Sequence, residues 1–395
     1  MESETTPIYA YRRFAPTGLM LGNVLTGCSV LAPAGMLSEL STGLDVTIRE
    51  AGLLITFGAV VLCIASPLSA WLTSRIERRT LLAATLAVLA LTNIASAFAP
   101  DYATLLVIRL IMLAVGALYT PQAAGTAALI VPAEKRGSTI AYIFLGWSIA
   151  AAVGLPLITL IASRYGWRAV YGGIGLIGCF SFLLLAWRLP RGLVSSPVDL
   201  KTWADVGRNR MIVILLSITT LQMSGQFVVF TFMGPLLTKL TNASPDAVGL
   251  VFALYGLFGF VGIAIATRIV DTWGAYSTSV LFTCLLLTGV GGWALGAGNY
   301  LLMACSVAIW GIGFASTNSM QQVRLVTAAP ALASASVSLN TSVLYIGQAV
   351  GSAIGGALYA RDMLFGAGYV SAAFVAFAVM LVFLTKPRQA AASPA

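Results

Sequence analysis

The chain has 395 residues, of which 59% are hydrophobic and only 9% are charged. Soluble domains carry about 25% charged residues, so this composition excludes a water-soluble particle and predicts a protein that is solvated by a lipid bilayer. The net charge is +9, but no basic patch lies on a soluble domain, so nucleic-acid binding is not expected.

Cysteine and histidine usage excludes several kinds of site. The number of cysteines is odd, no two of them form a CxxC pair, and all fall in apolar runs: Cys28, Cys63, Cys179, Cys284 and Cys305. Neither a disulfide framework nor a zinc site is therefore indicated. The chain contains no histidine, which removes imidazole metal ligands and Ser-His catalysis. We expect no metal and no cofactor.

Twelve apolar runs are each long enough to cross a bilayer, which takes about 20 residues of helix. Because backbone groups cannot stay unpaired in lipid, we expect helices rather than a barrel, and hence an all-α membrane protein. Residues 1–16 include Arg12 and Arg13 and lead into a run that is too long for a signal peptide, so we interpret them as a cytoplasmic tail. The runs are 16–38, 51–73, 80–99, 103–131, 139–163, 168–189, 211–237, 246–267, 277–297, 300–326, 333–360 and 364–385.

Basic residues between the runs predict the orientation. If the N-terminus is cytoplasmic, 16 Lys and Arg residues fall on the cytoplasmic side and 5 on the other, with Arg109 left inside a run. Basic loops are retained in the cytoplasm, so this bias places both termini inside the cell. The five on the other side are Arg49, Arg164, Arg168, Lys239 and Arg361.

The runs fall into two similar groups of six. A fixed offset of 197 residues aligns Gly52 with Gly249, Ser74 with Asp271, Gly116 with Gly313 and Gly154 with Gly351. Parallel repeats about an axis normal to the membrane are a known plan for transporters. We therefore expect two pseudo-symmetric six-helix halves, over 1–189 and 211–395, and a cytoplasmic linker over 190–210 with a short surface helix near 201–206.

The loop after the second run carries a recognisable motif. It resembles the G-x-L-a-D-r-x-G-r-k loop of the major facilitator superfamily, with Arg75, Arg78 and Arg79 at its basic positions. Ser74 and Glu77 stand where the family prefers Asp and Gly.

The equivalent loop in the second half keeps the acid and the glycine of the motif, as Asp271 and Gly274, but lacks the basic residues. The resemblance implies that both loops act in gating, by bridging helix ends in one conformational state. The alternative for the basic loop is charge that only sets topology.

Arg109 lies about 9 Å inside the fourth run, in a stretch that resembles the superfamily's l-x-x-R-x-x-q-G pattern. Charge inside a membrane is costly and usually functional, so we expect Arg109 to be coupled to transport. Its partner would be Glu39 at the outer end of the first run or a negative group of the substrate. The alternative is a structural arginine that is tied to helix-end carbonyls, with Glu39 as a solvated helix-end acid.

The fifth run resembles the glycine-proline pattern of the antiporter branch of the superfamily, at Gly146, Gly154 and Pro156. Gly347 and Gly351 in the eleventh run form the matching surface of the second half. We expect these glycines to allow close helix packing, which small-xxx-small repeats also produce in any membrane bundle.

The resemblance covers nearly the whole chain and is closest to bacterial drug:proton antiporters, including sugar-efflux and arabinose-efflux-like permeases. In this fold, spans one, four, five, seven, eight, ten and eleven line a central cavity. Polar side chains in the runs are therefore candidates for substrate contact, with interhelical hydrogen bonds as the alternative for each. The candidates are Asn23, Gln122, Trp147, Gln222, Gln226, Asn318, Asn340 and Tyr345, and Thr26, Tyr255, Gln321 and Gln348 are further polar residues of the runs.

None of the thirteen acids falls in the interior of a run, so a neutral, weakly polar or anionic solute is favoured over an organic cation. We expect a monomeric exporter in the bacterial inner membrane, driven by proton antiport through alternating access. The alternative is uptake or facilitated passage of a metabolite without proton coupling. An intramembrane enzyme would need a nucleophile with a base, paired acids or a metal site, and a sensor would usually carry an added soluble domain.

Overall fold

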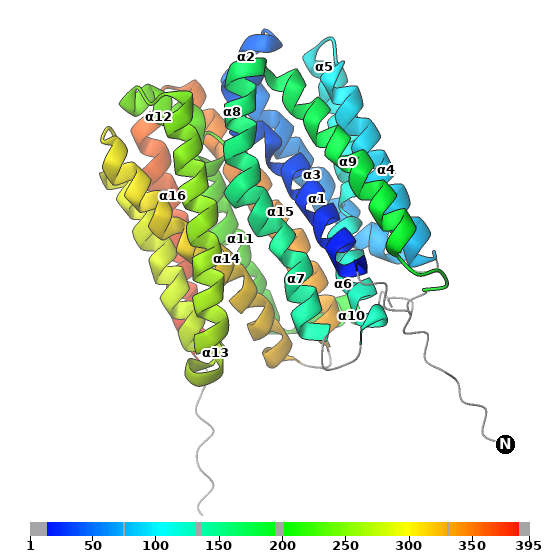
Figure 1. The fold of residues 1–395 in the computed structure, drawn as a ribbon. Coiled ribbons are helices and arrows are strands. Elements are labelled where there is room, and N and C mark those ends of the chain that lie inside the picture. The colour runs from blue at the N-terminus through cyan, green and yellow to red at the C-terminus, as the bar shows by residue number, and fades with distance from the viewer. Residues whose placement is uncertain (1–13, 74–75, 132–135, 194–200, 330–331, 387–395) are drawn as a thin grey trace, which may run out of the picture.

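The computed structural model describes residues 14–73, 76–131, 136–193, 201–329 and 332–386. These residues form a bundle of long helices that run side by side (Figure 1). Eleven of the described helices are long and apolar enough to cross a membrane, and the longest is α13 (Pro245–Leu295). Gly274 interrupts α13 with φ 77° and ψ 158°, a conformation that suits only glycine, so α13 consists of two spans and the twelve predicted spans are all present.

The first half follows the predicted runs but breaks three of them. The run over 16–38 ends early, after Pro33, and the runs over 103–131 and 139–163 are divided, the second by a π-helical turn. The elements are α1 (Ala15–Gly35), α2 (Leu37–Gly43), α3 (Ile48–Leu72), α4 (Arg78–Ala97), α5 (Tyr102–Gly116), α6 (Tyr119–Ile130), α7 (Arg136–Ile149), η2 (Ala150–Gly154), α8 (Leu155–Tyr165) and α9 (Trp167–Arg188).

The second half begins after the expected short helix of the linker, which extends to Arg208. Val206 of this helix is fully buried and packs with Ile212, Leu215 and Leu325, which fixes the linker to the second half. The elements are α10 (Lys201–Arg208), α11 (Arg210–Phe230), α12 (Met233–Thr241), α13, α14 (Tyr300–Ala328), α15 (Ala333–Ala360) and α16 (Leu364–Leu384).

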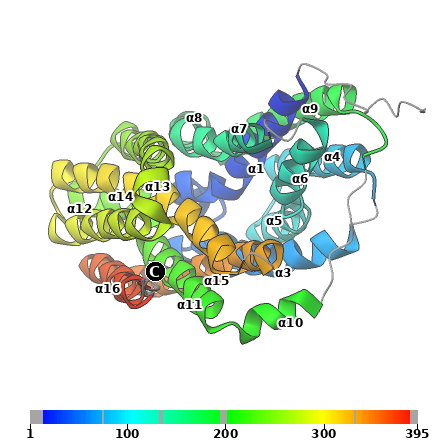
Figure 2. The ribbon, with the colours of Figure 1, turned by 90° about the horizontal axis from the view of Figure 1, so that it is seen from below.

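Each half is held together by its own helix pairs, such as α4 with α9 in the first and α11 with α15 in the second. The halves meet where α3 packs on α15 and where α13 packs on η2 and α8. Figure 2 shows the two groups from below, with α3 and α15 side by side between them.

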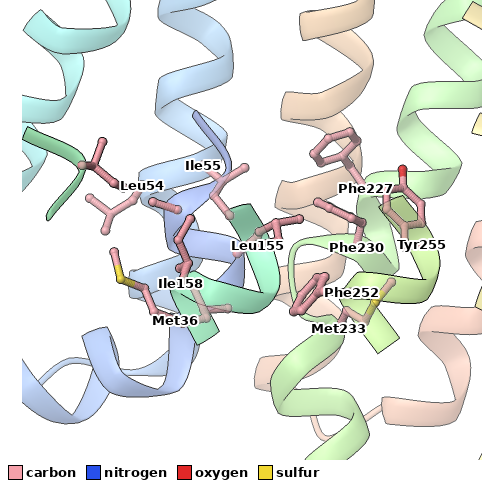
Figure 3. Close-up of a cluster of buried hydrophobic side chains, with 14 of the residues drawn as sticks. Met36, Leu54, Ile55, Leu155, Ile158, Phe227, Phe230, Met233, Phe252 and Tyr255 are labelled. Atoms are coloured by element: carbon pink, nitrogen blue, oxygen red, sulfur yellow. The ribbon is translucent and has the colours of Figure 1, made fainter. Parts of the chain in front are cut away.

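Apolar side chains from both halves are buried in one continuous cluster, and Figure 3 shows part of it. Met36, Leu155 and Ile158 come from the first half, and Phe230 and Phe252 from the second. Helices α2 and α12 lie in contact at one end of the bundle, which we call the α2/α12 end. It lies opposite the start of α1 (Figure 1).

Polar contacts also join the halves. Thr56 Oγ1 of α3 donates to Ser352 Oγ of α15 at 2.9 Å in a buried hydrogen bond. Arg164 of α8 lies 3.9 Å from Asp246 of α13 at the surface, where such an ion pair contributes at most about 1 kcal/mol. Closure of the α2/α12 end therefore rests mainly on packing.

Candidate functional site

A cavity of about 240 Å³ lies between the halves, and we call it the central cavity. Helices α1, α7 and η2 of the first half and α11, α13, α14 and α15 of the second supply its walls. None of the described side chains that line it is charged, and its walls are rich in aromatic rings: Phe144, Trp147, Phe227, Phe230, Tyr255, Phe314 and Tyr345.

Amide and hydroxyl groups interrupt these aromatic walls. Asn340 is 1% exposed, and its Oδ1 accepts from Thr219 Oγ1 at 2.7 Å while its Nδ2 donates to Asn318 Oδ1 at 3.5 Å. Gln322, Thr341 and Gln348 add further donors and acceptors to the same surface. Apolar walls with a few placed polar groups suit a ligand that combines apolar faces with neutral hydroxyl or amide groups.

Four of the eight candidate polar residues line the central cavity, namely Trp147, Asn318, Asn340 and Tyr345. The other four are bonded inside one half and do not line it. Asn23 Nδ2 donates to Ile143 O, Gln122 accepts from Arg78, Gln222 Nε2 donates to Thr283 Oγ1, and Gln226 Oε1 accepts from Trp310 Nε1.

Several lining residues were not among the candidates. The polarity of Ser148, Gln322 and Thr341 inside a span is a signal that could have found them. The phenylalanines carry no such signal, because a ring that faces a cavity and a ring that faces lipid look the same in sequence.

Arg109 lies on α5, is 1% exposed, and donates three hydrogen bonds to backbone carbonyls. Its Nε donates to Leu54 O of α3, and its Nη1 and Nη2 donate to Ser29 O and Val30 O of α1, each at 2.9 Å. Pro33 has no N–H to offer Ser29 O four residues earlier, so the guanidinium satisfies a carbonyl that the helix leaves free. These contacts match the alternative in which Arg109 is a structural arginine that is tied to backbone carbonyls.

Glu39 does not pair with Arg109, and no ion pair joins the two in the part of the chain that the structure describes. Glu39 lies half-buried in α2, in a surface groove that it shares with Thr42, Tyr165 and Arg168. Burial raises the pKa of its carboxyl above the ordinary value, so Glu39 binds a proton more readily than an exposed acid.

The basic loop after α3 contacts the first half and its linker. Ser74 and Arg75 lie outside the described residues. Arg78 is 4% exposed, its Nη1 donates to Gln122 Oε1, and its backbone N–H donates to Leu193 O at 2.8 Å. Arg79 Nη2 donates to Ala186 O of α9.

In the second half, Asp271 is exposed on α13, and Gly274 forms the kink between the two spans of that helix. The hydrogen bonds that Arg78 and Arg79 make to Gln122, Leu193 and Ala186 do not cross between the halves. The gating role of both loops stays a prediction.

The glycines of α7, η2 and α15 lie at helix contacts. A Cβ added at Gly146 would lie 2.5 Å from Met20 O of α1, and one added at Gly154 would lie 2.7 Å from Cys28 Sγ. In the second half, a Cβ at Gly347 or Gly351 would lie 2.5 or 2.2 Å from carbonyls of α11. Pro156 is the second residue of α8 and directly follows the π-helical turn η2.

Comparison with known proteins identifies the family. The model of the Major Facilitator Superfamily matches residues 19–239 and again residues 215–395. The chain belongs to the major facilitator superfamily. The predicted fold and the assignment to transporters rather than enzymes are therefore confirmed.

Relatives in the superfamily extend over almost the whole chain. The inner membrane transport protein YdhP of Escherichia coli O157:H7 is 30% identical over 94% of this chain and 95% of its own length. A probable sugar efflux transporter of Mannheimia succiniciproducens is 24% identical over 89% of this chain and 88% of its own. The crystal structure of a D-xylose–proton symporter superposes with a TM-score of 0.77 at 16% identity, covering 95% and 98% of the two chains, and this likeness supports the fold.

Proposed function

We propose that this superfamily member exports a small, neutral, hydroxylated solute of sugar size from the bacterial cytoplasm by proton antiport through alternating access. The observation that carries the proposal is the uncharged, aromatic and amide lining of the central cavity. A charged substrate would lose its hydration on entering this cavity and gain no opposite charge, so the lining favours a neutral solute over an anionic one. The relative that is named a probable sugar efflux transporter supports the same class.

Alternating access would follow from the way the halves meet. They are packed together at the α2/α12 end, so opening to that side requires the cluster around Leu155 and Phe252 to separate. We propose that this end faces the outside of the cell, which makes the described state closed to the outside.

The second candidate is uptake or facilitated passage without proton coupling. It is favoured by the absence of carboxylates from the described lining of the central cavity. Under proton antiport, the carboxyl that takes up the proton would lie elsewhere, and Glu39 is the described acid whose pKa burial raises.

Transport of radiolabelled methyl α-D-glucoside into inverted membrane vesicles tests both candidates. Export by antiport predicts uptake into these vesicles that requires an acidic interior and stops when an uncoupler collapses the pH gradient. Equilibration of the glycoside across the membrane at a rate that does not depend on the pH gradient would favour facilitated passage. If none of a panel of neutral glycosides is transported, that result would contradict the proposed substrate class.

Substitution of a cavity amide is expected to weaken substrate binding. Asn318→Ala removes one polar group from the wall, and we expect the KM for a transported glycoside to rise about 5- to 50-fold, the equivalent of one lost hydrogen bond with an unpaired partner. Ser316→Ala is the matched control, because Ser316 lies on the same helix and its hydroxyl bonds to Ile312 O of that helix. Equal KM values for the two variants would contradict a binding role of Asn318.

The membrane orientation can be measured by labelling single cysteines in a cysteine-free background. A membrane-impermeant maleimide should label Thr42→Cys, at the α2/α12 end, in intact cells. It should label Arg208→Cys, in α10, only after the cells are permeabilised. The charge bias of 16 to 5 is the physical reason. The reversed pattern would overturn the proposed orientation.

A further inference from the structure

A chain of three hydrogen bonds holds one aromatic wall of the central cavity. Trp147 Nε1 of α7 lies 3.1 Å from Thr120 Oγ1 of α6, and Thr120 Oγ1 lies 2.8 Å from Asn23 Oδ1 of α1. Asn23 Nδ2 then donates at 3.0 Å to Ile143 O, one turn before Trp147 on α7. These hydrogen bonds therefore link α7 to α6, α6 to α1, and α1 back to α7.

The direction of each bond in this chain is fixed. Asn23 uses its amide nitrogen on the carbonyl of Ile143, so its oxygen faces Thr120 and can only accept. Thr120 must therefore donate its single hydroxyl proton to Asn23 and accept from the indole N–H of Trp147. Asn23 is fully buried, so neither water nor lipid offers it a replacement partner.

Packing on α1 completes the placement of the ring. A Cβ added at Gly27 would lie 2.7 Å from Ala150 Cβ and 3.4 Å from Cε3 of Trp147, so the glycine lets η2 approach α1 closely beside the indole. The ring also packs against the buried cluster around Val30 and Leu113. With its nitrogen held by Thr120, the indole presents an apolar surface to the cavity.

We propose that Thr120, a residue outside the cavity lining, is a positioning residue that sets substrate selectivity by holding the indole N–H of Trp147 away from the ligand. When Thr120 is present, Trp147 offers a stacking surface, which suits the apolar face of a neutral ring. Without the threonine hydroxyl, the indole N–H is free to turn toward the cavity and bind an acceptor there. The second half holds a chain in the corresponding spans, from Thr219 through Asn340 to Asn318. The inference rests on the proposed function only for its transport readout.

The decisive experiment observes the indole directly and needs no substrate. In protein labelled with ¹⁵N-tryptophan and reconstituted in nanodiscs, the resonance that Trp147→Phe removes is the indole N–H of Trp147. Thr120→Val keeps the shape of the side chain and deletes the hydroxyl, so this resonance should shift and exchange faster with water. Thr120→Ser should restore it. An unchanged resonance in Thr120→Val would overturn the proposal.

Thr126→Val is the control for replacing a threonine in the same helix, because Thr126 is fully buried and its hydroxyl bonds to Gln122 O within α6. It should leave the indole resonance of Trp147 in place. A shift equal to that of Thr120→Val would show a general loosening of α6 and contradict a positioning role.

A transport readout separates positioning from stability. Thr120→Val should raise the KM for methyl α-D-glucoside about 5- to 50-fold while kcat changes less. This effect should vanish in a Trp147→Phe background, because the hydrogen bond between Thr120 and the indole N–H is already absent there. An equal effect in both backgrounds would overturn the proposal. If the wild type transports no glycoside, the proposed function fails while the resonance still decides the role of Thr120.

Discussion

Gly256→Ala is expected to lower transport at least about tenfold and to shift the protein toward a state in which the α2/α12 end is open. An alanine Cβ at this position of α13 would lie 2.2 Å from Ala152 Cα, 2.3 Å from Ala152 N and 2.5 Å from Ala151 C. These are backbone atoms of η2, so no side-chain rotation can relieve the overlap. Overpacking of this kind costs about 1–3 kcal/mol, which is a large bias on an equilibrium between two conformations of similar energy.

The distance between spin labels at Ser163 of α8 and Thr238 of α12 measures the effect, because these exposed positions lie near the α2/α12 end of the two halves. Gly256→Ala should increase the population of long distances. Gly249→Ala is the matched control, since Gly249 lies seven residues earlier on the same helix face and its added Cβ would lie an ordinary 3.8 Å from Pro156 O. Identical distance distributions in the two variants would show that the contact at Gly256 does not close this end.

The fold was predictable from sequence because span length and loop charge follow directly from the bilayer. The details that the sequence did not predict are local departures from the α-helix. Nothing in the segment from Ala150 to Gly154 distinguishes a π-helical turn from an α-helical one, because three alanines, a valine and a glycine fit either. The early end of α1 had a signal in Pro33, but helices in membranes often continue through a proline.

The candidate site was predictable only in part, because polarity shows that a residue needs a partner but not where the partner lies. Asn340 and Gln226 gave the same signal, yet one reaches the central cavity and the other bonds to Trp310 inside the second half. The rotation of each helix about its axis decides between these outcomes. That rotation is set by close contacts between residues that are far apart in the sequence, such as the contact between Gly351 and Ser224 O.

Arg109 is the position where we expect the largest loss of stability. Arg109→Met supplies an apolar side chain of similar length, but it leaves the carbonyl of Ser29 without a donor and removes a second hydrogen bond from the helical carbonyls of Val30 and Leu54. One unpaired buried carbonyl costs about 1–3 kcal/mol, and the two other lost bonds to the charged guanidinium add to this, so the loss should reach about 3 kcal/mol and remove most transport. Arg109→Lys should lose nearly as much, because an ammonium group cannot span carbonyls on both α1 and α3 as the planar guanidinium does.

Thermal unfolding in detergent, followed beside transport in vesicles, checks this expectation. Arg324→Met is the matched control, since Arg324 is another buried arginine and donates hydrogen bonds to the side chains of Ser279, Gln321 and Thr385. Hydroxyl and amide side chains can turn to other partners when an arginine is removed, whereas backbone carbonyls cannot, so this variant should unfold at a higher temperature than Arg109→Met. An Arg109→Met protein that matches Arg324→Met in stability and still transports would rule out the structural role. A stable, inactive Arg109→Met protein would instead favour direct coupling, and Glu39→Gln would then show whether the pH dependence of transport requires that carboxyl.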